Sequence, residues 1–125
     1  HLVADEKLNV VSKQTANFNR SEGMSVMENM LQANSAIQGV FAHNDEMALG
    51  AVEAVGNKKI LAIGFDATDD AVAAVKAGKM VATVAQKPDL MGETAVETAI
   101  QILQGETVEK TIPVEVELIT KDTAQ

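Results

Sequence analysis

Asn44 and Asp66 are the side chains of this chain best placed to bind a ligand. Each follows a short apolar run, at residues 39–42 and 60–63, and each precedes a segment that favours a helix. In an open α/β sheet, residues just past the carboxyl ends of the strands line the ligand crevice. Asp66 also has an aromatic neighbour, Phe65. A carboxylate beside an aromatic face at such an edge suits a small polyhydroxylated molecule.

Both residues also have a simpler explanation as helix caps. Asn44 stands directly before Asp45 and Glu46, and an Asn cap followed by acids complements the positive end of a helix dipole. Asp66 could cap the next segment in the same way. Asn44 remains a candidate ligand because its amide offers both a donor and an acceptor, as a sugar hydroxyl requires.

Three further residues are candidates for ligand contact. The chain holds three Phe and no Trp or Tyr. Phe41 lies inside an apolar run and is expected in the core, whereas Phe18 and Phe65 lie among polar loop residues, where an aromatic ring can contact a ligand. Gln86 follows the run at 80–85, which is apolar apart from Thr83. Gln86 is a pocket or hinge candidate, or else a solvated loop residue.

The sequence lacks the residues and motifs that several other functions require. It has no Cys, only two His, no nucleophile elbow and no phosphate loop, so no catalytic set can be assembled and we expect no enzyme. We also expect no cofactor and no metal, because the acids near residue 66 do not follow the spacing of a calcium loop. The net charge of −8 and the scattered basic residues argue against nucleic-acid binding. No apolar run is long enough to insert in a membrane.

The elements that must position these residues alternate along the chain. The pattern predicts strands at 8–12, 39–42, 60–63, 80–85 and 112–119, and helices at 20–33, 45–55, 69–77 and 88–104. Methionines at helical spacing on the first helix are expected to pack in the core. This order predicts an α/β fold, a doubly wound parallel sheet with helices on both faces. Residues 1–7 read like the tail of a helix, and we expect the chain to be a fragment or a processed piece.

Five motifs resemble the carboxyl-terminal half of the periplasmic ribose-binding proteins, which serve ABC transporters. They are FAHNDEMALGA at 41–51, GFD at 64–66, ATVAQKP at 82–88, NFNR at 17–20 and PVEVELI at 113–119. The first two are shared with other pentose- and hexose-binding proteins and with sugar-responsive repressors, whereas the third points more narrowly to ribose. The resemblance covers essentially the whole chain.

The resemblance implies a receptor whose two α/β lobes close over one sugar, D-ribose or a close pentose or hexose. Carried over by position, Phe18 and Phe65 would pack against the sugar ring, and Asn44, Asp66 and Gln86 would bind its hydroxyls. The implied partners are an ABC permease, with a chemoreceptor as a second candidate. The implied location is the periplasm, or a lipid anchor outside the cell in a Gram-positive organism.

The resemblance also divides the chain between two lobes of the periplasmic-binding-protein type I fold. Residues 1–86 would form a carboxyl-terminal lobe without its first strand and helix. Residues 87–115 would be a helix and a strand of the amino-terminal lobe, and residues 116–125 would return to the carboxyl-terminal lobe. The missing amino-terminal half would then be a partner of this piece. The alternative is the effector-binding core of a sugar-responsive transcription repressor, which shares the fold.

Overall fold

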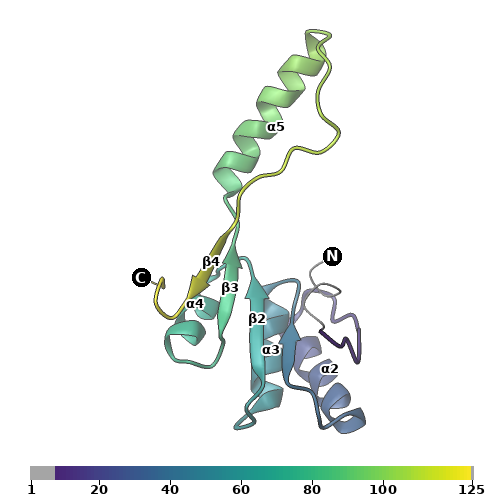
Figure 1. Ribbon diagram of the computed structural model, residues 1–125, viewed down its shortest axis with the longest axis vertical. Helices are drawn as coiled ribbons and strands as arrows, with labels where there is room; N and C mark the ends of the chain where they lie inside the picture. The colour runs from purple at the N-terminus through teal and green to yellow at the C-terminus, as the bar shows by residue number, and fades with distance from the viewer. Residues whose placement is uncertain (1–7, 125) are drawn as a thin grey trace.

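The computed structural model describes residues 8–124, which form one four-stranded sheet and four helices (Figure 1). Their order is α2 (Arg20–Ala33), β1 (Gly39–Phe41), α3 (Asp45–Val55), β2 (Leu61–Phe65), α4 (Asp69–Lys76), β3 (Ala82–Ala85), α5 (Pro88–Leu103) and β4 (Glu117–Thr120). The predicted α/β class is therefore confirmed. The helix tail expected at residues 1–7 lies outside the described residues.

The sheet is mixed rather than wholly parallel. Its strands lie in the order β1-β2-β3-β4, with β1, β2 and β3 parallel and β4 antiparallel to β3. The strand predicted at 112–119 is shorter than expected, because pairing with β3 begins only at Glu117, opposite Ala85. The three parallel strands point their carboxyl ends toward one edge, the edge where the candidate ligand residues follow.

The helices begin and end where the capping residues stand. The side chain of Asn19 caps α2, that of Asn44 caps α3 and that of Thr68 caps α4. The predicted cap role of Asn44 is thus confirmed. The predicted cap role of Asp66 is wrong, because Thr68 is the N-cap of α4. Gly56 follows α3 with φ of 57°, a conformation that glycine adopts without a steric penalty.

The described helices cover one face of the sheet. Ala42, which directly follows β1, and Ala62 of β2 are buried in one cluster with residues of α3 and α4. Since strand residues alternate between faces, Phe41 and Leu61 point to the other face, where they are 57% and 61% exposed. Helices were expected on both faces, whereas the described helices cover one. Phe41 was expected in the core, and this prediction is wrong for the described chain, because no described helix covers the face to which Phe41 points.

Residues 8–12 do not form the predicted strand. They carry no strand assignment in the structure, and Leu8 and Val11 are 63% and 51% exposed. β1 is the last strand on that side of the described sheet, and its paired neighbour is β2. The other edge of β1 is therefore open, and residues 8–12 do not pair with it.

Helices α2 and α3 pack closely through a second apolar cluster. Met27 and Leu31 of α2 are buried against Ala51 and Val55 of α3, which confirms the predicted core role of the methionine face. Gly50 permits the approach, because a Cβ there would collide with the backbone carbonyl oxygen of Arg20. This packing fixes where the amino-terminal ends of both helices lie.

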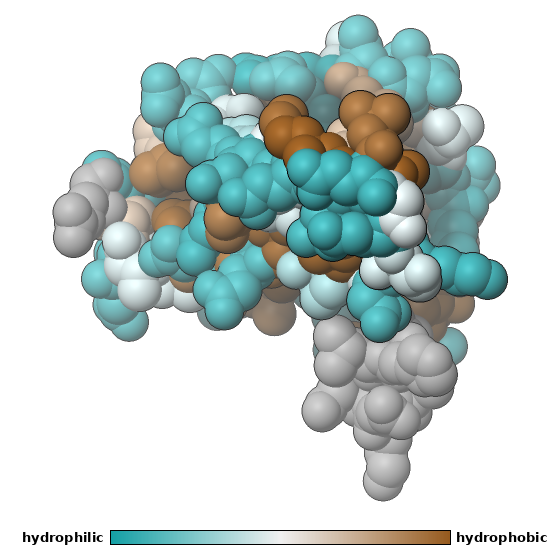
Figure 2. Space-filling view, turned by 90° about the horizontal axis from the view of Figure 1, so that it is seen from above, coloured by the Kyte–Doolittle hydropathy of each residue, from teal (hydrophilic) through white to brown (hydrophobic). Residues whose placement is uncertain are grey.

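Helix α5 stands apart from the sheet (Figure 1). None of its residues is buried, and large apolar side chains along it are open to solvent, including Leu103 at 86% exposure. The others are Leu90, Met91, Val96, Ile100 and Ile102. Seen from above in Figure 2, brown hydrophobic groups lie open among hydrophilic ones. No helix within residues 8–124 is long and apolar enough to cross a membrane.

Candidate functional site

The candidate ligand residues gather at the carboxyl edge of the three parallel strands. Asn44 follows β1, Asp66 follows β2 and Gln86 follows β3. Because β1, β2 and β3 run side by side in parallel, residues just past their ends lie at the same edge of the sheet. The edge predicted from the sequence is therefore present in the fold.

Asp66 and Gln86 are in direct contact. The Nε2 amide of Gln86 donates a hydrogen bond of 2.6 Å to Oδ1 of Asp66. The Asp66 backbone N–H donates to the Val84 carbonyl at 2.8 Å, which ties the turn to β3. Asp66 is exposed, so its carboxylate can accept hydrogen bonds from a polar molecule at this edge.

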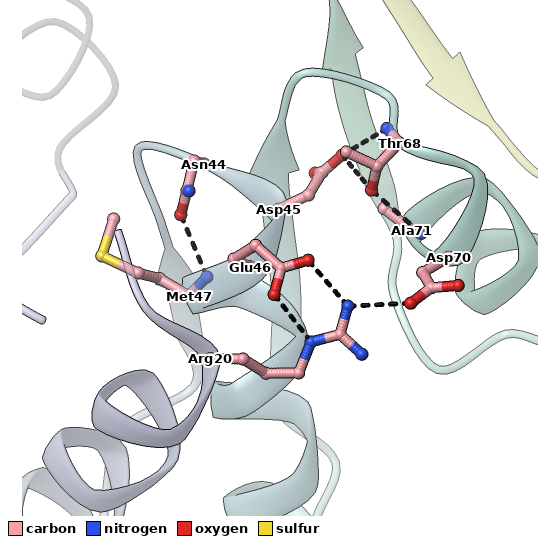
Figure 3. A network of polar contacts seen from close by, with 8 residues as sticks. All are labelled: Arg20, Asn44, Asp45, Glu46, Met47, Thr68, Asp70 and Ala71. Atoms are coloured by element: carbon pink, nitrogen blue, oxygen red, sulfur yellow. Dashed lines mark hydrogen bonds and ion pairs between the residues drawn. The ribbon is translucent and has the colours of Figure 1, made fainter. Parts of the chain in front are cut away.

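Asn44 holds the start of α3 and keeps a donor free. Its Oδ1 accepts from the Met47 backbone N–H at 3.0 Å (Figure 3). Its Nδ2 donates to no described residue. Since no buried side-chain nitrogen or oxygen within residues 8–124 lacks a partner, this amino group is open to solvent even though only 9% of Asn44 is exposed. A capping Asn can therefore still offer its amino group to a ligand, so the structural role and the binding role are compatible.

The two loop aromatics lie next to elements that lead to this edge. Phe18 immediately precedes Asn19, the cap of α2, and it is 65% exposed with φ of 55°. Phe65 is the last residue of β2 and is half-buried. Phe18 thus presents an open apolar ring held by a left-handed turn rather than by core packing.

A buried carboxylate that the sequence reading assigned only to the helix dipole lies beneath the edge. Asp45 is fully buried. Its Oδ2 accepts from the Thr68 backbone N–H at 2.7 Å and from the Thr68 hydroxyl at 3.1 Å, and its Oδ1 accepts from the Thr83 hydroxyl at 2.7 Å. The sequence signal for this network was Thr83, the polar residue in an otherwise apolar strand.

Arg20 joins the amino-terminal ends of three helices at the same side (Figure 3). It donates to both carboxylate oxygens of Glu46, at 3.0 Å from Nε and 2.7 Å from Nη2, and to Asp70 at 2.8 Å. Hydrogen bonds to Glu46 and then to Asp70 raise the pKa of Arg20 above its usual value. The partners lie 26 and 50 residues away in sequence, so no local pattern could reveal the network.

The site is an open edge suited to hydrogen bonding. Within residues 8–124 no group of three or more His, Cys, Asp or Glu is arranged to hold a metal ion. A hollow of about 380 Å³ lies between α3 and α4, lined by Arg20 and Asp70 at one end and by apolar residues such as Val52. The edge offers amide and carboxylate groups, which can hydrogen-bond to the hydroxyls of a polar ligand.

The fold and this edge place the chain in a known class. A family model described as a periplasmic binding protein domain matches residues 2–107, and the chain belongs to that family. A solved periplasmic solute-binding protein of an ABC transporter from Actinobacillus succinogenes, with bound D-allose, has a TM-score of 0.81 and 33% identity. That match covers 98% of this chain and 46% of the solved one.

Among individual proteins, the chain is similar to ribose import binding proteins. It is 54% identical to that of Bacillus subtilis over 97% of this chain, and 53% identical to that of Haemophilus influenzae over 92%. The chain spans about 40% of the length of each relative. The resemblance and the type I fold class expected from the motifs are confirmed. These relatives are binding proteins and not enzymes, in agreement with the missing catalytic set.

Proposed function

We propose that this chain contributes half of a sugar site in a transport receptor that binds D-ribose or a close relative. The observation that carries the proposal is the Asp66–Gln86 pair, set at the carboxyl edge of the sheet in a chain 54% identical to a ribose import binding protein. A second lobe would supply the other half of the site. Sugar would stabilise the closed arrangement by touching both lobes.

The proposed roles follow the chemistry of each side chain. Asp66 accepts hydrogen bonds from sugar hydroxyls, while Asn44 and Gln86 bind hydroxyls through their amides. Hydrogen bonds to a charged group contribute about 1.5–3 kcal/mol each, so Asp66 is the strongest polar contact. Phe18 and Phe65 pack against the apolar faces of the ring. A pocket of this kind rejects sugars that lack a hydroxyl, because the polar group would be left unpaired.

The exposed helix α5 supports a division of the chain between two lobes. None of its residues is buried within residues 8–124 and its large apolar side chains are exposed, and burying them would gain about 25 cal/mol per Å² of apolar surface. We assign residues 1–86 to the carboxyl-terminal lobe, 87–115 to an amino-terminal lobe and 116–125 to the carboxyl-terminal lobe again. Residues 112–116 form no strand in the described chain, and we propose that the other lobe completes one.

The partners and the location follow from the transport role. A sugar-loaded receptor of this class would dock on an ABC permease outside the cytoplasmic membrane, in the periplasm or on a lipid anchor. We propose a chemoreceptor as a second candidate partner of this receptor. Transport is favoured over the repressor core because the relatives reported above are import binding proteins.

A sugar panel on the intact protein tests the proposal. D-ribose, D-allose, L-arabinose and myo-inositol would be titrated separately by calorimetry. We expect one-to-one binding with D-ribose the tightest ligand. Tighter binding of D-allose would support the receptor function and replace D-ribose as the preferred sugar, whereas no binding of any of the four would refute the proposed function.

A further inference from the structure

The turn that presents Asp66 is held in an unusual backbone conformation. Asp66 and Ala67 both have positive φ, at 118° and 56°, although neither is glycine. Such conformations are costly for residues with a Cβ, and they persist only where the surroundings over-determine them. The turn therefore needs a restraint that is independent of any ligand.

Asp45 supplies that restraint from beneath the turn. The Ala67 backbone N–H donates to the Thr83 hydroxyl at 3.2 Å, and the same hydroxyl donates to Asp45 at 2.7 Å. The next N–H, that of Thr68, donates directly to Asp45 at 2.7 Å. Two consecutive backbone groups after Asp66 are thus bound, one directly and one through Thr83, to a single buried carboxylate.

The surroundings are shaped to admit this carboxylate. Asp45 and Thr83 are both fully buried, and a charge so placed is costly unless hydrogen bonds satisfy it. Gly64 of β2 leaves the room, because a Cβ there would collide with Oδ1 of Asp45. A hydrophobic residue would fill this space without the cost of burying a charge, so the carboxylate serves an end other than packing.

We propose that Asp45 and Thr83 are positioning residues of the ligand site: they hold the Asp66–Ala67 turn and so set the affinity for the sugar. This inference rests on the proposed function, because it takes Asp66 as a ligand residue. Neither Asp45 nor Thr83 touches the sugar in this account. Their effect passes through the Ala67 and Thr68 backbone N–H groups.

Thr83 is the better residue to substitute. Asp45 also binds Thr68, the cap of α4, so a change at Asp45 would disturb that helix as well. Thr83→Val keeps the shape but removes both hydrogen bonds, whereas Thr83→Ser keeps the hydroxyl. In the intact protein we expect Thr83→Val to weaken D-ribose binding roughly five- to tenfold. We expect Thr83→Ser to restore most of the affinity. Amide hydrogen exchange at Ala67 and Thr68 should accelerate in Thr83→Val without sugar.

A control separates positioning from general stability. Val75 is fully buried in the α4 core and takes no part in the clamp, the hydrogen bonds of Asp45 and Thr83 to the Ala67 and Thr68 backbone. Val75→Ala should lower the melting temperature at least as much as Thr83→Val and leave the D-ribose Kd within about twofold at temperatures where both are folded. Unchanged affinity in Thr83→Val, or an equal loss in Val75→Ala, would overturn the inference. Absence of sugar binding by the unaltered protein would instead refute the proposed function, and unchanged amide exchange would still refute the clamp.

Discussion

Replacing Phe18 by Ala should weaken sugar binding and leave the fold intact. Burial of a whole Phe side chain contributes about 1.5–3 kcal/mol. Phe18 is 65% exposed, so covering it fully in a closed, sugar-bound site would gain about two-thirds of that value, or about 1–2 kcal/mol. Its loss corresponds to roughly a five- to thirtyfold rise in the Kd for D-ribose.

The stability effect should be small for the same reason. A side chain this exposed contributes little to the folded state without ligand, so the free energy of unfolding should change by less than about 0.5 kcal/mol. The positive φ of 55° does not favour Phe over Ala. Calorimetry with D-ribose and thermal unfolding without it measure the two effects separately in the intact protein.

Phe18→Tyr is the matched control, because it keeps a flat ring and should bind within about twofold of the unaltered protein. An unchanged Kd in Phe18→Ala would show that the ring does not contact the sugar. A large fall in the melting temperature would show instead that Phe18 is core in the intact protein. Either result refutes the reasoning from exposure.

Three other substitutions test separate parts of the structure. Asp66→Ala should weaken D-ribose binding tenfold or more, because it removes hydrogen bonds to a charged acceptor worth about 1.5–3 kcal/mol each; unchanged affinity by calorimetry would remove Asp66 from the site. Arg20→Gln should lower the free energy of unfolding by about 1 kcal/mol, with a smaller difference in 1 M NaCl since the ion pairs are partly exposed; a loss independent of salt would contradict the electrostatic explanation. Gly50→Ala should cost about 1–3 kcal/mol by forcing α2 away from α3; an unchanged free energy of unfolding in chemical denaturation would show that the close helix approach does not limit stability.

Local patterns predicted the elements well because their determinants are local. Helix α2 begins and ends at the residues expected, since an Asn cap and spaced apolar side chains lie within its own sequence. The carboxyl edge could also be predicted, because three parallel strands must end together. The pairing of Asp66 with Gln86 then follows from the adjacency of β2 and β3.

The sequence-based predictions failed where a structure depends on a partner outside the local sequence. Residues 8–12 have a strand pattern but pair with no strand of the described chain, and Phe41 has apolar sequence neighbours but no covering helix. The Arg20 network joins residues far apart in sequence. The clamp under Asp66 was missed because an acid after an Asn cap already had a sufficient explanation in the helix dipole.

A crystal structure of the intact protein with D-ribose would show whether this edge is half of a sugar site. We predict hydroxyls of the sugar within hydrogen-bond distance of Asp66, Asn44 and Gln86, with the rings of Phe18 and Phe65 against its faces. We also predict α5 packed on a second lobe. Ribose bound away from this edge, with Asp66 open to solvent, would contradict the account.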